Sequence, residues 1–132
     1  MNFTIRTEYA LRALHEVILG EGKPVNRKRI SVNQKISEHF LEKICLDLKK
    51  SNILKSKMGP GGGFTISREP GSISFWDIYK AVDLQDEESR TCYPGLKGEC
   101  ELMDKCRVKD IWTKFNQKLI ESMSSITLDD IT

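Results

Sequence analysis

The sequence predicts a mainly α-helical protein with one small β-hairpin and a long helix near its end. Apolar residues recur at three- and four-residue spacing in several separate segments, as they do in amphipathic helices. A glycine-rich turn stands between two short segments that contain apolar residues, which indicates a hairpin. At 132 residues the chain forms one domain, or one domain plus an extension. Because only 39% of the residues are hydrophobic, we expect some apolar surface to be buried against a second copy.

The first helix is expected over residues 4–19, and a segment that contains glycine and proline ends it. A short second helix follows, capped by Asn26 and carrying Ile30. Ser37 is a favourable N-cap for a third helix, and Asn52 can adopt the left-handed conformation just beyond that helix. The apolar stripe of the third helix is formed by Phe40, Leu41, Ile44, Cys45 and Leu48.

Two short extended segments, residues 53–57 and 64–67, are expected to pair around the glycine-rich turn at 59–63. Ser74 then begins a fourth helix, with Asp77 three residues later in a capping-box position. These signals predict a hairpin that is followed directly by a helix.

A last helix of roughly 27 Å is expected from about residue 108 to residue 126. It follows a polar, acidic segment that we expect to be a loop. Because the tail at 127–132 is too short to cover the apolar seam of this helix, we expect the seam to meet a second copy. The seam consists of Val108, Ile111, Trp112, Phe115, Leu119 and Met123, with Ile126 at its end.

A helix, a short helix, a tight turn, a third helix and a glycine hairpin follow one another as in a winged helix-turn-helix. The chain therefore divides into a DNA-binding domain at 1–83, a cysteine-bearing loop at 84–106, and a dimerisation helix and tail at 107–132. The helix after Ser37 would enter the major groove of double-stranded DNA, and the hairpin, or wing, would lie along the backbone or in the minor groove. The candidate DNA contacts are Arg27, Lys28, Ser37, Glu38, His39, Glu42, Lys43, Lys55, Lys57, Gly61 and Gly62, with Arg29 and Lys49 as further phosphate contacts.

The charges are divided between the two halves of the chain. Residues 1–70 hold 13 basic and 7 acidic side chains, a balance of +6, and residues 71–132 hold 8 basic and 12 acidic, a balance of −4. A basic half favours a polyanion as its partner. Taken one at a time, the same cations could be the solvated surface of a small helical domain.

Three cysteines, Cys92, Cys100 and Cys106, fall within the acidic half. Their spacing has no Cys-x2-Cys knuckle of the kind that structural zinc sites use, although zinc and a thiol sensor stay open as alternatives. Soft thiolates also suit an iron–sulfur cluster, which usually takes four ligands, so a fourth would come from elsewhere. Cys45 lies on the apolar stripe of the third helix and is expected to be an ordinary core residue.

The chain resembles the bacterial IscR/NsrR/RirA family of regulators over essentially its whole length. The resemblance is carried by residues 7–14 (TEYALRAL), 36–42, the wing at 59–64, 126–128 and the three cysteines. The family consists of dimeric winged-helix transcription factors, many of which bind an iron–sulfur cluster whose state changes DNA binding. They report iron supply, cluster demand, oxidants or nitric oxide.

The resemblance implies that Cys92, Cys100 and Cys106 are ligands of a 2Fe–2S or 4Fe–4S cluster. Members similar to IscR have a histidine as fourth ligand where this chain has Lys109, whereas members similar to NsrR use an N-terminal carboxylate of the other subunit, at the place of Glu8. Glu8 is equally interpretable as a solvated acid of a first helical turn. Weaker alternatives for the fourth ligand are Glu101, Asp104, Asp110 and an exogenous group.

In the same comparison Glu42 stands where an acidic residue tunes the choice of DNA site, and Met58 replaces the arginine that usually precedes the wing glycines. We therefore expect weaker reading of a narrow minor groove, or its transfer to Lys57. Together these features predict a homodimer that binds a palindromic operator under control of a cluster.

Other classes of protein are less well supported. The longest aliphatic run near the N-terminus is three residues, so neither a membrane span nor an export signal is expected, and the protein should be cytoplasmic. The histidines His15 and His39 lie on different elements without an apparent nucleophile, so an enzyme is not expected. A regulator of the same fold that works as a cluster-free thiol switch or metal sensor remains an alternative, as does a small iron–sulfur electron carrier, which would have no use for the wing.

Overall fold

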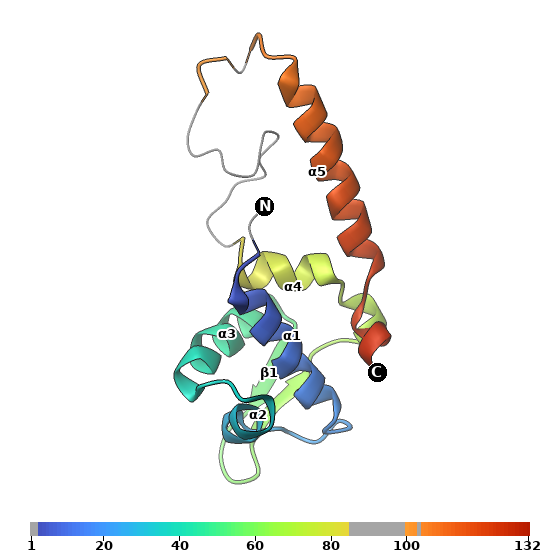
Figure 1. Ribbon diagram of the computed structural model, residues 1–132. Coiled ribbons are helices and arrows are strands. Elements are labelled where there is room, and N and C mark those ends of the chain that lie inside the picture. Colours follow the sequence, from blue (N-terminus) through green and yellow to red (C-terminus); the bar gives the residue numbers. More distant parts are fainter. Residues whose placement is uncertain (1–2, 85–99, 103) are drawn as a thin grey trace.

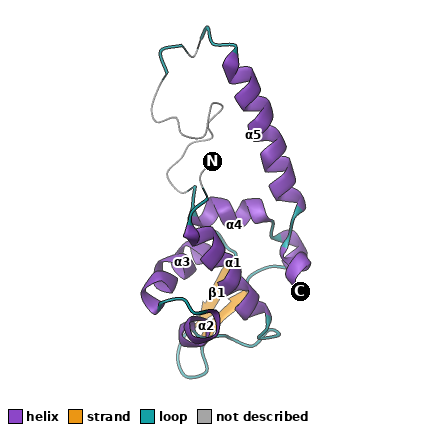
Figure 2. Ribbon diagram, viewed as in Figure 1, coloured by secondary structure: helices purple, strands orange, loops and turns teal. Residues whose placement is uncertain are grey.

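The computed structural model describes residues 3–84, 100–102 and 104–132, and it confirms a mainly helical chain with one hairpin (Figures 1 and 2). The predicted loop at 84–106, with Cys92 in it, lies largely outside the described residues. The elements in order are α1 (Ile5–Ile18), α2 (Arg27–Gln34), α3 (Glu38–Lys50), β1 (Leu54–Lys57), β2 (Gly63–Ile66), the 3-10 turn η1 (Pro70–Ser72), α4 (Phe75–Val82), α5 (Val108–Ser125) and the 3-10 turn η2 (Leu128–Ile131).

The helices begin at the residues that the sequence indicates. Asn26 accepts a hydrogen bond from the backbone N–H of Arg29 at 2.8 Å, and Ser37 accepts one from Phe40 at 3.3 Å. Asn52 adopts a left-handed φ of 57° beyond α3, and so does Lys35 between α2 and α3. These local signals place α2 and α3 as a helix-turn-helix pair.

The wing is an antiparallel hairpin in which Leu54 pairs with Ile66 and Lys57 with Gly63. Its base is joined to the segment before α2, since Val25 and Phe64 exchange backbone hydrogen bonds of 2.9 and 2.8 Å. Gly63 permits this contact, because it has a φ of 149° and a Cβ there would lie 2.5 Å from the carbonyl carbon of Val25. The wing is therefore fixed to the helical domain at its base.

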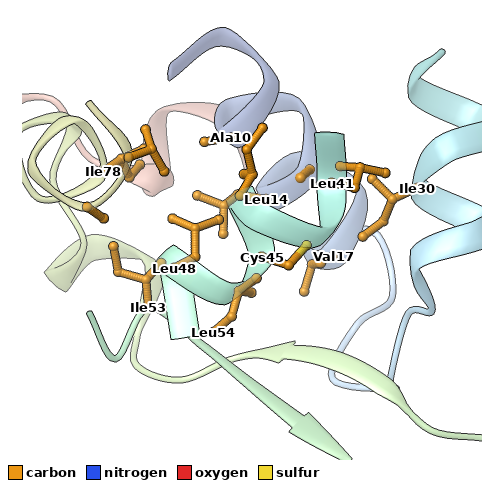
Figure 3. Packing of buried hydrophobic residues seen from close by; sticks show 14 of the residues in the cluster. Ala10, Leu14, Val17, Ile30, Leu41, Cys45, Leu48, Ile53, Leu54 and Ile78 are labelled. Atoms are coloured by element: carbon orange, nitrogen blue, oxygen red, sulfur yellow. The ribbon is translucent and has the colours of Figure 1, made fainter. Parts of the chain in front are cut away.

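The core lies between α1, α3, α4 and the base of the wing (Figure 3). Cys45 belongs to it, as predicted. Phe40 was expected on the same stripe, but 46% of its surface is exposed. It lies at the edge of the stripe, where its ring meets that of Tyr9 at a distance of 5.6 Å between ring centroids. The larger core residues include Leu14, Ile30, Leu41, Ile44, Leu48, Ile53, Ile73 and Ile78.

Helix α5 packs against α4 and extends away from the rest of the described chain (Figure 1). The segment after it is more than the short tail that the sequence indicated. The backbone N–H of Leu128 donates to Ile73 at 3.0 Å, and that of Phe75 donates to Ile126 at 2.8 Å. Because Leu128 is also buried in the core, the start of α4 and the end of the chain form one packed unit.

Candidate nucleic-acid interface and cysteine site

The exposed face of α3 carries the residues that were expected to read bases. Glu38, His39, Glu42 and Lys43 are all exposed, on the side opposite the core stripe. The hydroxyl of Ser37 caps the helix, so Ser37 positions α3 in addition to any contact with DNA. Four polar or charged side chains thus stand along the first half of α3.

The other candidate contacts surround this helix on neighbouring elements. Arg27 and Lys28 are exposed in the first turn of α2, and Lys55 and Lys57 are exposed on β1. Gly61 lies exposed in the turn of the wing, whereas Gly62 is half-buried, and a Cβ on Gly62 would collide with the backbone carbonyl oxygen of Lys57.

Sequence reasoning missed a buried carboxylate, Glu16 on α1, which is 3% exposed. It accepts hydrogen bonds from Arg29 at 3.0 Å and from Asn33 and Gln34 at 3.1 Å each, all of them on α2. Burial alone would raise the pKa of Glu16, but the hydrogen bonds from Gln34, Asn33 and Arg29 and the charge of Arg29 outweigh burial and lower it. Arg29, expected to contact phosphate, is therefore engaged in holding α2 to α1.

A second buried carboxylate, Asp47, lies on α3 and was also missed. Its oxygens accept from Arg6 at 2.6 Å and from Lys43 at 3.1 Å, and its side chain is only 1% exposed. The available signal for both carboxylates was a polar residue on a predicted apolar face, three positions after Ala13 and after Ile44 respectively. Arg6 thus binds the start of α1 to α3, the expected recognition helix.

A third polar contact binds the start of α1 to the end of α4. The backbone N–H of Thr4 donates to the Asp83 carboxylate at 3.2 Å, and the hydroxyls of Thr4 and Thr7 donate to the same carboxylate. Asp83 is the residue that follows α4 directly. The first turn of α1 is therefore held on one side by α3 and on the other by the start of the segment that leads to the cysteines.

Of the three predicted ligands, Cys100 and Cys106 are free, half-buried thiols just before α5, and Cys92 lies outside the described residues. Cys45 is unsuited to ligation, because burial raises the pKa of its thiol to about 11 despite the opposing charge of Arg27.

Glu8, the predicted fourth ligand, is half exposed and forms an ion pair with Arg12 at 2.9 Å. Lys109 occupies the first turn of α5, and the alternatives Glu101, Asp104 and Asp110 are exposed. Within the described parts of the chain, no three His, Cys, Asp or Glu side chains gather closely enough to hold a metal ion.

The helix-turn-helix, the basic wing and the long C-terminal helix define a DNA-binding regulator of the winged-helix class. The chain belongs to the Rrf2 family, whose model, described as an iron-dependent transcriptional regulator, matches residues 3–132. It is thus a transcriptional regulator and not an enzyme, which confirms both predictions. None of the helices in the described ranges is long and apolar enough to cross a membrane.

Relatives of known type support this assignment. The chain is 33% identical to the HTH-type transcriptional regulator IscR of Klebsiella pneumoniae and to that of Citrobacter koseri, over 99% of this chain and 79% of each relative. Among solved structures it is similar to T. potens IscR, with 28% identity and a TM-score of 0.72 over 99% of this chain and 85% of the other. The global cysteine regulator CymR of B. subtilis shares the fold, with a TM-score of 0.74 and 23% identity over 99% and 95% of the two chains.

Proposed function

We propose that this chain is a homodimeric, cytoplasmic regulator whose binding to a palindromic operator is controlled by an iron–sulfur cluster on Cys92, Cys100 and Cys106. The observation that carries the proposal is the position of Cys100 and Cys106, which are free thiols directly before α5 in a chain of an iron-dependent family. The alternative of a small electron carrier leaves the wing and the recognition helix without a role.

The donor set fits such a cluster in its chemistry. Three thiolates are soft ligands that suit 2Fe–2S and 4Fe–4S centres, and the cluster, when bound, supplies sensitivity to iron supply, oxidants or nitric oxide. A fourth ligand is required in most sites of this kind. We assign it to Glu8 of the partner subunit, whose carboxylate is exposed and is engaged only by the exposed side chain of Arg12 within the described residues.

The dimer is proposed to form through α5. Val108, Ile111 and Phe115 recur on one face of this helix and are 57%, 69% and 47% exposed. Trp112 and Leu119 are half-buried beside them, whereas Met123 is 3% exposed and already packs within its own chain. The proposed interface therefore uses the predicted seam as far as Leu119. Met123 is not part of it, because it is buried within its own chain.

Each subunit would place one α3 in the major groove, with the two helices about one DNA turn, roughly 34 Å, apart. Glu42 would accept a hydrogen bond from cytosine N4, and Arg27, Lys28, Lys55 and Lys57 would neutralise phosphates.

Contacts on α1 support a structural connection between Glu8 and the DNA-reading surface. Glu8 lies in the same turn as Thr7, which binds Asp83, and two residues after Arg6, which binds Asp47 on α3. If Glu8 served as the fourth ligand on the partner subunit, it would leave Arg12, and the start of α1 would take a second position. The recognition helices of the two subunits then take a different spacing, which gives two states biased by a ligand.

The decisive test is a variant with all three cysteines, Cys92, Cys100 and Cys106, replaced by serine. After anaerobic purification it should contain no iron or sulfide, and its DNA affinity should not respond to iron or oxidant, because serine cannot supply soft ligands. Iron, sulfide and absorption are measured beside DNA binding, and Cys45→Ser serves as the matched control with one lost thiol in the core. A triple variant with the wild-type response would contradict the proposal.

Glu8→Ala tests the fourth ligand separately. We expect a cluster that is lost faster and has a changed absorption spectrum, while the fold and the basal DNA affinity persist. An unchanged spectrum and unchanged cluster stability would remove Glu8 from the site.

A second candidate function, a thiol switch without a cluster, is favoured by the half-buried, free state of Cys100 and Cys106. Colourless, iron-free protein after anaerobic purification, together with DNA binding that depends on oxidation, would support this candidate.

Met58, the residue after β1, is 88% exposed and should be a weak reader of the minor groove. Met58→Arg is expected to tighten binding to operators with A·T-rich flanks by about tenfold, because a narrow minor groove attracts a guanidinium. Fluorescence titrations with A·T-rich and G·C-rich flanks measure the effect, and Met58→Gln controls for polarity. Equal gains on both flanks would show a general charge effect instead.

A further inference from the structure

A hollow lies between the first turn of α1 and the first half of α3. It has a volume of about 220 Å³ and is lined by Arg6, His39, Phe40, Lys43 and Ile44. Phe40 forms one wall and is held in place by its edge-on contact with Tyr9 at 5.6 Å. The hollow thus has an apolar side, while three of its five lining side chains are basic.

Asp47 holds two of these basic side chains, Arg6 and Lys43. The carboxylate accepts from Arg6 at 2.6 Å and from Lys43 at 3.1 Å while it is almost wholly buried. A buried carboxylate that pairs two cations fixes both in place. Because the cations are 31% and 53% exposed, and a guanidinium and an ammonium each carry several N–H donors, each keeps donors that Asp47 does not use.

The charges leave room for one more anion. Two cations and one carboxylate give a net charge of +1 before His39 at the rim is counted. A single phosphodiester group carries one negative charge, and its two free oxygens can accept from a guanidinium and an ammonium together. Lys43 and His39 also stand on the exposed face of α3 that is expected to approach DNA.

We propose that this hollow seats one backbone phosphate of the operator in each half-site, bound jointly by Arg6 and Lys43, with Asp47 as the positioning residue. The inference rests on the binding of duplex DNA through α3. It adds a contact from α1, outside the helix-turn-helix and the wing. The phosphate would thereby fix the first turn of α1 to the DNA at the point where α1 also meets α3.

The test uses the full-length dimer and an operator duplex selected from a random pool, with one phosphate at a time replaced by a neutral methylphosphonate. Wild-type protein should lose about tenfold in affinity at one position in each half-site. Arg6→Gln and Lys43→Gln should bind the unmodified duplex more weakly than wild-type protein does. A methylphosphonate at that same position should then lower their affinity hardly any further. Lys80→Gln is the matched control, since Lys80 is a similarly exposed lysine that pairs with an acid of its own helix, Asp77 on α4.

If Arg6→Gln keeps the full wild-type loss at every position, the hollow binds no phosphate in the complex and the proposal is wrong. Should Arg6→Gln fail to fold, Arg6→Lys retains the charge and must retain the loss at that position. Inorganic phosphate alone should leave the melting temperature unchanged. If inorganic phosphate raised the melting temperature of wild-type protein but not that of Arg6→Gln, the hollow would instead be a site for free phosphate.

The positioning role of Asp47 has its own readout. Asp47→Asn should raise the affinity for random-sequence duplexes and steepen its dependence on salt by about one counterion, because two unneutralised cations attract anions more strongly. A purely structural role predicts the reverse, a parallel fall in affinity for random and selected duplexes. Such a parallel fall in affinity would show that Asp47 does not act as a positioning residue. If none of the variants changed DNA binding, the proposed binding of DNA through α3 would itself be wrong.

Discussion

Replacing Ile111 and Phe115 together with aspartate is expected to convert the proposed dimer to a monomer and to weaken operator binding by at least about a hundredfold. Both side chains are large, apolar and 69% and 47% exposed on one face of α5. Burial of each in an interface contributes about 1.5–3 kcal/mol, and a buried, unpaired carboxylate in its place opposes association. A monomer contacts one half-site only, so the second set of DNA contacts is lost.

The measurement is light scattering after size-exclusion chromatography, followed by DNA titration on a full operator and on a single half-site. The double variant should bind both duplexes with similar, weak affinity, whereas wild-type protein should strongly prefer the full operator. Gln117→Asp is the matched control, because Gln117 is exposed about half a turn around α5 from this face. If the double variant and the control are both dimers, another surface forms the dimer.

The sequence predicted the elements of this fold well because each depends on local signals. The caps at Asn26 and Ser37, the capping box at Ser74 and the glycine-rich wing are determined by residues a few positions apart. Exposure of the α3 residues followed from the helical period in the same way. The edge of an apolar stripe was harder to define, and Phe40 lay just outside it.

Features that depend on residues distant in the sequence could not be predicted. Glu16 is buried because three donors approach it from α2, and Asp47 because Arg6 reaches it from α1. The final segment was expected to be a tail because its backbone hydrogen bond joins Leu128 to Ile73, 55 residues earlier in the chain. Neither the periodicity nor the spacing of residues predicts these contacts. A charged residue on an apolar face does, however, indicate that it requires a partner.

Glu16 therefore carries the second large effect, on stability and on its pH dependence. Glu16→Ala is expected to lower the free energy of unfolding by about 2–3 kcal/mol, because three hydrogen bonds between α1 and α2 are lost. Since α2 supports the recognition helix, operator affinity should fall with stability, and thermal and denaturant unfolding measure the loss directly.

The pH dependence separates the charge of Glu16 from its shape. The pKa of its carboxyl is lowered in the folded chain, so its ionised form contributes stability above its ordinary pKa of about 4.3. That contribution is lost as the pH falls through the lowered value. Wild-type protein should therefore be more stable than Glu16→Gln at neutral pH, and the difference should shrink as the pH falls below the ordinary pKa of a glutamate and through the lowered one.

Glu8→Gln is the matched control, because Glu8 is a carboxylate on the same helix with an exposed ion-pair partner. In cluster-free protein it should lower the free energy of unfolding at neutral pH far less than Glu16→Gln does, since water already screens that pair. If Glu16→Gln has the same profile as wild-type protein, the bonds at Glu16 do not depend on its charge. Side-chain packing, and not the charge of Glu16, would then hold α1 against α2. Arg29 would in that case be available to contact a DNA phosphate.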